Sequence, residues 1–224
     1  MDALLENFFN IAVFREVLPF LLQGLLTTLG LSALVIPTGL LGGLAVALAA
    51  TQSQSKFITR LVTAYVDLFR ALPPIVLLIF IYFGFPFLGL DLPKLLAVAL
   101  GFLLNNSAYY GEIFRAGLLS VPAGQTEAAR STGLTRAQTL IHVVIPQAAR
   151  NVLPDLVSNS IEVVKLTTIA SVVALPELLR IARDAQALVY NPSPIVLAAL
   201  IYLVLLWPLV RWLSRLEHRN LLAR

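Results

Sequence analysis

Strongly apolar intervals alternate with short polar ones along the whole chain. Five apolar intervals stand out, at about 18–50, 57–85, 95–119, 153–174 and 194–213. Each is long enough to cross a bilayer as a helix, which takes about 20 residues. The pattern therefore predicts an all-α membrane protein with five transmembrane helices. The proline pair at 73–74 predicts a kink or break inside the second of them.

The longest polar interval, residues 121–151, has a local pattern of its own. Pro122 suits the first turn of a helix, and Gly133 suits the position just after its end. Thr135 followed by Gln138 fits a capping box, which predicts that a second short helix begins there. The interval therefore predicts two short helices joined at a bend, between the third and fourth spans.

Composition supports a membrane location and narrows the chemistry. Hydrophobic residues make up 58% of the 224 residues, charged residues make up 12%, and the mean hydropathy is +0.87. There is no cysteine, so disulfides and thiolate metal sites are excluded. The net charge of +4 comes from residues on loops between spans and gives no reason to expect nucleic-acid binding. HExxH, GxSxG and Walker A motifs are absent, so any ATP hydrolysis needs a separate protein.

Basic residues are distributed unequally between the two sets of loops. One set carries ten of them: Lys56, Arg60, Arg115, Arg130, Arg136, Arg150, Arg211, Arg215, Arg219 and Arg224. The other set carries four: Arg15, Lys94, Arg180 and Arg183. The positive-inside rule places the first set in the cytoplasm, with the N-terminus outside and the C-terminus inside a bacterial inner membrane. An acidic head and a long first apolar interval argue against a cleavable signal peptide.

This orientation places residues 122–146 in the cytoplasm. Pro146 is expected to interrupt or reset the second short helix. A compact projection between membrane helices, with a small surface at Ala128 and Ala129, is a device for engaging a partner protein. We therefore interpret 122–146 as a cytoplasmic coupling segment within a single membrane domain, residues 1–224.

Polar residues recur at helical spacing within the spans, where they are costly unless they face a bundle interior or water. The third span carries Asn105, Tyr109 and Glu112 at intervals of four and three. The fourth carries a longer stripe: Asp155, Ser158, Asn159, Glu162, Lys165 and Thr168. Thr167, next to Thr168 in the sequence, is added to the candidate path residues. Glu162 and Lys165 are spaced to form a pair.

Two interpretations of these stripes stay open. Either they line a transport path for a polar solute, or they hold the bundle together by hydrogen bonds between helices. We favour the path for the fourth-span stripe and neither interpretation for the third. For Asp67 and Arg70, near the expected end of a span, we favour a structural ion pair. A channel with the same stripes and an intramembrane enzyme using Glu112 or Asp155 are the rival functions.

The coupling segment carries a recognisable spacing. Glu127-Ala128-Ala129, three residues, Gly133, nine residues, Val143, one residue and Ile145-Pro146 resembles the EAA motif of binding-protein-dependent ABC importer permeases. The wider chain is similar to the polar amino acid subfamily, the histidine, glutamine and cystine importers. The similar pieces are Arg70-Ala71-Leu72-Pro73, Ile81-Tyr82-Phe83-Gly84, the run 108–117, Gly124-Gln125, Pro146-Gln147-Ala148 and Leu216-Glu217-His218-Arg219.

The resemblance implies a type I ABC importer permease fold that works as a pair of membrane subunits, identical or related. Two ATPase subunits, which bind the ATP and Mg²⁺, would dock on the coupling segments, and a periplasmic amino-acid-binding protein would deliver substrate. The residues implied in coupling are Gln125, Glu127, Ala128, Ala129, Gly133 and Leu134. Arg70, Pro73 and Pro146 are implied as structural, and this chain is expected to bind no cofactor or metal.

Two departures from the family pattern concern the substrate. The chain has Lys165-Leu166-Thr167-Thr168 where the family usually has Lys-Asp-Thr-Ser, and Arg70-Ala71-Leu72-Pro73 where it has Arg-Gly-Thr-Pro. A cationic amino acid would require the missing carboxylate near mid-membrane. The sequence therefore predicts a neutral or acidic substrate, or a partner subunit that carries the site.

Overall fold

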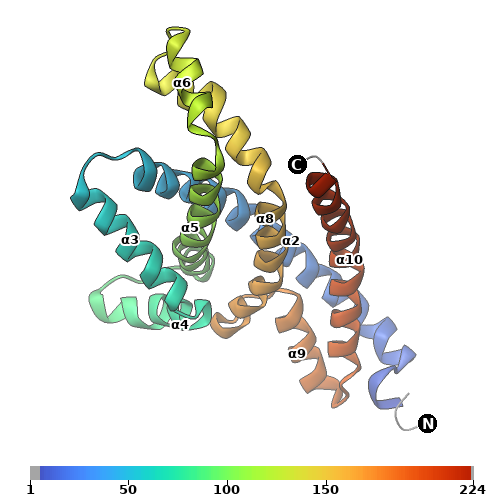
Figure 1. Cartoon of the computed structure of the whole chain (residues 1–224). Coiled ribbons are helices and arrows are strands. Elements are labelled where there is room, and N and C mark those ends of the chain that lie inside the picture. The colour runs from blue at the N-terminus through green and yellow to red at the C-terminus, as the bar shows by residue number, and fades with distance from the viewer. Residues whose placement is uncertain (1–5, 223–224) are drawn as a thin grey trace. The chain divides into compact units, whose positions relative to one another are not determined.

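The chain folds into helices joined by short turns in this computed structural model, which describes residues 6–222 and their side chains up to residue 215 (Figure 1). The side chain of His218 and the tail arginines 219 and 224 lie outside that description. The α-helices are α2 (Ile11–Gln52), α3 (Lys56–Ala71), α4 (Pro74–Ile79), α5 (Lys94–Ser120), α6 (Ala123–Ser131), α7 (Arg136–Thr139), α8 (Ile145–Leu166), α9 (Leu178–Val189) and α10 (Ser193–Leu222).

The chain divides into two compact units, and three long helices belong partly to each. Unit 1 comprises Met1–Val35, Pro74–Gly101 and Ile161–Arg224, and unit 2 comprises Ile36–Pro73 and Phe102–Ser160. Three of the four divisions fall inside α2, α5 and α8, and the fourth falls at the break between α3 and α4.

Unit 1 has its core where α9 and α10 meet the first part of α2. Leu21, Leu178 and Ala198 form this core with Val17 and Ala182, and all five are almost wholly buried. Figure 1 shows α9 and α10 packed side by side. The chain reaches α9 through a short 3-10 segment, Thr167–Val173, that follows α8.

Unit 2 is built on a close crossing of α2 and α5. A Cβ added at Gly43 would lie 2.4 Å from the Tyr110 Cβ, and one at Gly39 would lie 2.8 Å from the Asn106 Cβ. No side chain fits at those distances, so the Gly39 and Gly43 pair allows the two helices to touch through backbone. The four-residue spacing of these glycines therefore serves the packing of α2 against α5.

The predicted break of the second span is present. α3 ends at Ala71, Leu72 is extended with φ −80° and ψ 128°, and α4 begins at Pro74. A proline has no N–H to continue the helical hydrogen bonds, so consecutive prolines at 73 and 74 stop the helix. A π-helical segment, Phe80–Gly84, and a 3-10 turn, Phe85–Leu88, follow α4.

Fewer helices qualify as spans by length and hydropathy than the five predicted. Within the described residues, Glu6–Gln52, Arg136–Val173 and Ser193–Arg215 qualify, and the bent pair of α3 with 74–88 raises the number to four. α5 has the length but is diluted by polar side chains, among them Asn105, Asn106 and Glu112. The structure thus shows an all-helical membrane protein, and the count of five stays a prediction.

Candidate coupling segment and polar stripes

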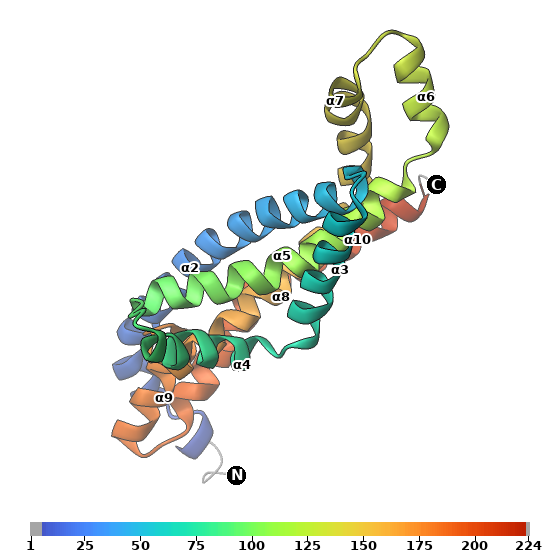
Figure 2. The ribbon, with the colours of Figure 1, turned by 90° about the vertical axis from the view of Figure 1, so that its left-hand side faces the viewer.

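The coupling segment consists of the two predicted short helices, α6 and α7, which project together from unit 2 (Figure 2). Gly133 has φ +89°, a conformation that glycine adopts without strain, and it makes the turn between them. The Gln138 N–H donates to the Thr135 Oγ1 at 3.2 Å, and the Thr135 N–H donates to the Gln138 Oε1 at 2.9 Å. The capping box predicted from the sequence is therefore confirmed.

The face that α6 presents is smaller than predicted. Glu127 and Ala128 are exposed, but Ala129 is buried, so the expected Ala128–Ala129 surface is wrong for Ala129. Ala129 lies on the inner side of α6, where its carbonyl accepts a bond from the Thr132 hydroxyl at 2.8 Å. Arg130 spans the turn and donates to the Leu134 carbonyl at 2.6 Å. These bonds fix the turn, so that Glu127 stands on a rigid helix.

Hydrogen bonds and apolar packing attach the coupling segment to the membrane helices of unit 2. The Arg136 guanidinium donates to the Gln52 carbonyl at the end of α2, at 3.2 Å. Asn151 on α8 donates to the Ser120 hydroxyl at the end of α5, at 2.8 Å. Gln125 accepts from Gln147 at 3.4 Å. An apolar cluster centred on the buried Ala47, Leu118 and Ala148 joins α2, α5 and α8 at the same end.

Pro146 lies at the second residue of α8, directly after a π-helical turn, Leu140–Val144. The sequence predicted that Pro146 would interrupt or reset the helix, and the resetting is what occurs. The chain continues as helix from Arg136 to Val173 and is not broken there. The turn with one extra residue accommodates the proline, as such turns commonly do in functional helices. α7, the π-helical turn and α8 therefore form one continuous helix.

Polar side chains of α5 donate hydrogen bonds to the backbone carbonyls at the end of α3. The Asn105 amide donates to the Phe69 carbonyl at 2.9 Å, and the Tyr109 hydroxyl donates to the Arg70 carbonyl at 3.4 Å. The carbonyls of a last helical turn have no partner within the helix, and Pro73 and Pro74 have no N–H to supply one. Asn105 and Tyr109, predicted as path residues, thus hold the broken helix in this conformation.

The expected ion pair between Asp67 and Arg70 is wrong. The ion pairs among the described residues do not include Asp67 with Arg70. The Arg70 guanidinium instead lies 5.6 Å from the centre of the Tyr109 ring. Attraction of a cation to an aromatic face explains why Arg70 turns toward α5. Glu112 pairs with Arg115, which donates to it through Nε at 2.9 Å and Nη2 at 2.5 Å.

The α8 stripe is more exposed than the α5 stripe. The predicted Glu162–Lys165 pair is present, with side-chain exposures of 56% and 47%. Ser158 is exposed, and the half-buried Asn159 leaves its amide nitrogen without a hydrogen-bond partner. Thr167 is buried and donates to the Val164 carbonyl at 2.7 Å. The Thr168 hydroxyl bonds the Lys165 carbonyl at 2.8 Å. Charged and polar groups on this helix are therefore available to a solute or a partner.

Glu177 is a buried polar residue whose role the sequence did not predict. Its side chain is wholly buried and caps α9, accepting from the Leu179 N–H at 2.8 Å and the Arg180 N–H at 2.7 Å. The Tyr202 hydroxyl also donates to it, at 3.4 Å. Burial raises the pKa of the Glu177 carboxyl, and these hydrogen bonds offset the shift only in part. An acidic residue directly before an amphipathic helix is the sequence feature that could have predicted this N-cap.

The comparisons with known proteins define the class. Residues 36–221 match the family described as "Binding-protein-dependent transport system inner membrane component", which covers most of the chain. The chain belongs to this family. It is therefore a multi-pass permease component of an inner membrane transport system, and the ATPase is another subunit. The resemblance read from the sequence is confirmed.

Two relatives in Bacillus subtilis are similar to the chain over most of their length. It is 36% identical over 212 residues to "Probable glutamine ABC transporter permease protein GlnP" of Bacillus subtilis (strain 168), covering 92% of this chain and 96% of the relative. It is 34% identical over 190 residues to "Arginine transport system permease protein ArtQ" of the same organism, covering 84% and 86%.

The solved structure of "an amino acid ABC transporter with histidines" superposes with a TM-score of 0.82 at 36% identity, covering 92% of this chain and 96% of that one. The inward-facing MetNI methionine ABC transporter superposes with a TM-score of 0.74 over 90% of this chain, at 22% identity, and supports the fold alone.

Proposed function

We propose that this chain is the permease subunit of an ATP-driven importer for polar amino acids. It crosses the inner membrane five times, with its N-terminus in the periplasm and its C-terminus in the cytoplasm. It pairs with a second permease, identical or related, and with two ATPase subunits that hold the ATP and Mg²⁺. A periplasmic amino-acid-binding protein delivers the substrate. Family membership and the amino acid transporters among the relatives support this assignment.

The observation that carries the proposal is the construction of the coupling segment. Two short helices are fixed by a capping box and a glycine turn, yet Glu127 and Ala128 remain exposed. A membrane protein gains nothing for its own stability from so rigid a projection. A rigid exposed projection suits transmission of force from a separate ATPase, with Gln125, Gly133 and Leu134 shaping the surface around Glu127.

The transport step proceeds by alternating access. Closure of the ATPase pair on ATP moves α6 and α7, and the continuous helix from α7 into α8 transmits that movement to the spans. The spans then change from facing the cytoplasm to facing the periplasm, and hydrolysis reverses the change. Along the path, the substrate meets polar side chains of α5, of α8 and of the 3-10 segment after it: Asn105, Tyr109, Glu112, Ser158, Asn159, Glu162, Lys165, Thr167 and Thr168.

The substrate is a neutral or acidic amino acid. Leu166 stands between Lys165 and Thr167, where a carboxylate would favour a cationic side chain. Glu162 is already paired with Lys165, so its charge is compensated. Glutamine and arginine both occur in the names of the relatives, so the choice rests on these residues. Preferred uptake of arginine or lysine through a pair of identical copies would contradict it.

Reversing the charge of Glu127 tests the coupling role. In proteoliposomes that contain the complete complex and the binding protein, we expect Glu127→Lys to reduce ATP-driven uptake at least about tenfold. The cation meets the surface that accepts Glu127, while the fold is unaffected because the residue is exposed. Asp91→Lys makes the same reversal at an exposed residue outside the coupling segment and should leave uptake unchanged. Normal uptake by Glu127→Lys would refute the coupling role.

The rival channel function makes a separate prediction. A channel conducts without nucleotide and has no use for an ATPase. Purification of the tagged chain from its native membrane, followed by mass spectrometry of the proteins that accompany it, separates the two. An accompanying protein with a Walker A motif supports the importer. A stable oligomer of this chain without one supports the channel.

A further inference from the structure

We propose that a cavity in unit 2 is a binding site for the charged head group of a free amino acid, an inference that rests on the proposed function. The cavity has a volume of about 350 Å³ and is lined by the end of α2, by α3 and by α5. The size falls within the range of small-molecule sites. Its lining residues are Ala50, Thr59, Val62, Thr63, Val66, Asp67, Arg70, Glu112 and Arg115.

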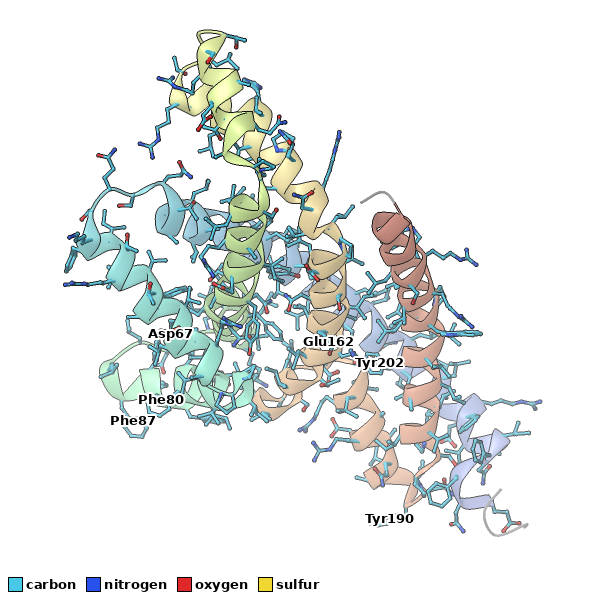
Figure 3. The ribbon with its side chains drawn as sticks, in the orientation of Figure 1. Asp67, Phe80, Phe87, Glu162, Tyr190 and Tyr202 are labelled. Atoms are coloured by element: carbon cyan, nitrogen blue, oxygen red, sulfur yellow. The ribbon has the colours of Figure 1, made fainter. Side chains whose placement is uncertain are left out.

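The four charged residues of the cavity are not equivalent. Glu112 and Arg115 neutralise each other through two hydrogen bonds. Asp67 forms no hydrogen bond or ion pair with any residue that the structure describes. The Arg70 guanidinium donates no hydrogen bond to a described residue either. An anion and a cation without hydrogen-bonded partners therefore share one wall, on the last two turns of α3, where Figure 3 marks Asp67. Arg70 also interacts electrostatically with Glu112.

The Tyr109 ring explains why these two charges remain apart. Asp67 and Arg70 are three residues apart on a helix, a spacing at which opposite charges commonly pair. Arg70 is instead held over the ring of Tyr109, whose hydroxyl bonds the Arg70 carbonyl. Asp67 and Arg70 are both exposed and do not pair with each other, so both charges are available to a ligand.

An α-amino acid is the ligand that matches this arrangement. Its ammonium and carboxylate groups are attached to one carbon, so that they can meet an anion and a cation one helical turn apart. We assign the ammonium to the Asp67 carboxylate and the carboxylate to the Arg70 guanidinium, which favours carboxylates through its fork of donors. A simple anion or cation would satisfy only one of the two.

The position of the cavity suggests which side of the membrane it serves. Ala50 lies two residues before Gln52, the residue whose carbonyl binds Arg136 of the coupling segment. Under the proposed orientation, this is the cytoplasmic end of unit 2. The cavity therefore takes an amino acid from, or releases it to, the cytoplasm.

Protection of a single introduced cysteine tests the site directly, because the chain has no cysteine of its own. Thr63 is exposed and lines the cavity, so Thr63→Cys should react with a membrane-impermeant thiol reagent in inverted membrane vesicles. L-glutamine, used as the probe, should slow this reaction. 4-Aminobutyramide, which lacks the carboxylate, and glutaramate, which lacks the ammonium, should not.

Second substitutions assign the two charges. Added to Thr63→Cys, either Asp67→Asn or Arg70→Gln should raise the L-glutamine concentration for half protection about tenfold or more. Arg60→Gln, on the same helix and outside the cavity, is the matched control and should leave protection unchanged. A thiol introduced by Thr126→Cys, on the coupling segment, should never be protected. Equal protection in the wild-type, Asp67→Asn and Arg70→Gln backgrounds would overturn the site, as would protection by both analogues.

Transport measured separately keeps this inference distinct from the proposed function. If the Thr63→Cys complex imports glutamine but glutamine does not protect the introduced thiol, the importer stands and the cavity site fails. If the thiol is protected as expected but no amino acid is imported with ATP, the site stands as an amino-acid site and the proposed importer fails.

Discussion

The polar residues of α5 and those of α8 have the same spacing in sequence and different surroundings in the structure. Asn105 on α5 is 2% exposed, and its amide is bonded to the end of α3. Glu162 on α8 has a side-chain exposure of 56%, and the one described side chain that it bonds is Lys165, three residues away on the same helix. A polar stripe in a membrane helix therefore serves either a neighbouring helix or an external ligand, and spacing alone does not distinguish them.

The difference teaches what to look for beside such a stripe. α5 faces a helix that ends at a proline pair, and its polar groups satisfy carbonyls that would otherwise be unpaired in lipid. The described part of α8 from Ser158 to Lys165 faces no such helix end. Its charges therefore lack that structural reason, which supports a role in transport.

The largest expected difference between the two stripes is in their access to water. The single substitutions Asn105→Cys and Glu162→Cys can be compared because the chain has no cysteine of its own. We expect the thiol of Glu162→Cys to react with a water-soluble reagent at least about tenfold faster than that of Asn105→Cys, since thiolates form only where water reaches them. Equal rates would end the distinction between the stripes. Failure of cysteines at 159, 162 and 165 all to react would remove α8 from the transport path.

Stability should depend on the α5 stripe. Asn105→Leu removes the donor to the Phe69 carbonyl, and the unpaired carbonyl should lower the free energy of unfolding by about 1–3 kcal/mol. Scanning fluorimetry in detergent should show a lower melting temperature, by about 2–4 °C per kcal/mol. Ser158→Ala on the exposed stripe is the control and should leave the melting temperature unchanged. An unaltered melting temperature for Asn105→Leu would show that the hydrogen bond to Phe69 does not hold α3.

The smallest expected effect is the contribution of the Glu162–Lys165 pair to stability. A double-mutant cycle with Glu162→Gln and Lys165→Gln should give a coupling energy of about 0.5 kcal/mol or less, because both side chains are well exposed. Thermal unfolding of the four variants measures it. A coupling energy above about 1.5 kcal/mol would indicate that this pair is a structural lock, like the contacts of α5.

Much of the local structure could be predicted from the sequence because local rules determine it. The turn at Gly133, the capping box at Thr135, the break at Pro73 and the pair of Glu162 with Lys165 all depend on neighbours within four residues. Each of these predictions is confirmed. The same kind of rule predicted an ion pair between Asp67 and Arg70 on α3, and that prediction is wrong. The ring of Tyr109, from a distant part of the sequence, attracts Arg70.

Contacts between distant segments could not be predicted in this way. The inward position of Ala129, the burial of Glu177 and the attachment of Arg136 to Gln52 depend on which helices meet, and spacing does not specify that. The resemblance implied a coupling surface with named residues, and that role stays a prediction; the burial of Ala129 among them could not be predicted from spacing. The roles of the path residues remain predictions for the experiments above.

The π-helical turn at Leu140–Val144 sets an angle as well as accommodating a proline. A π turn holds one more residue than an α turn, and each residue of an α-helix advances about 100° around the axis. If the same residues formed regular α-helix instead, Ser158 and Asn159 would be rotated by roughly that angle relative to α7. The chain would keep its composition, its coupling surface and its polar stripe, but with the two facing in different directions.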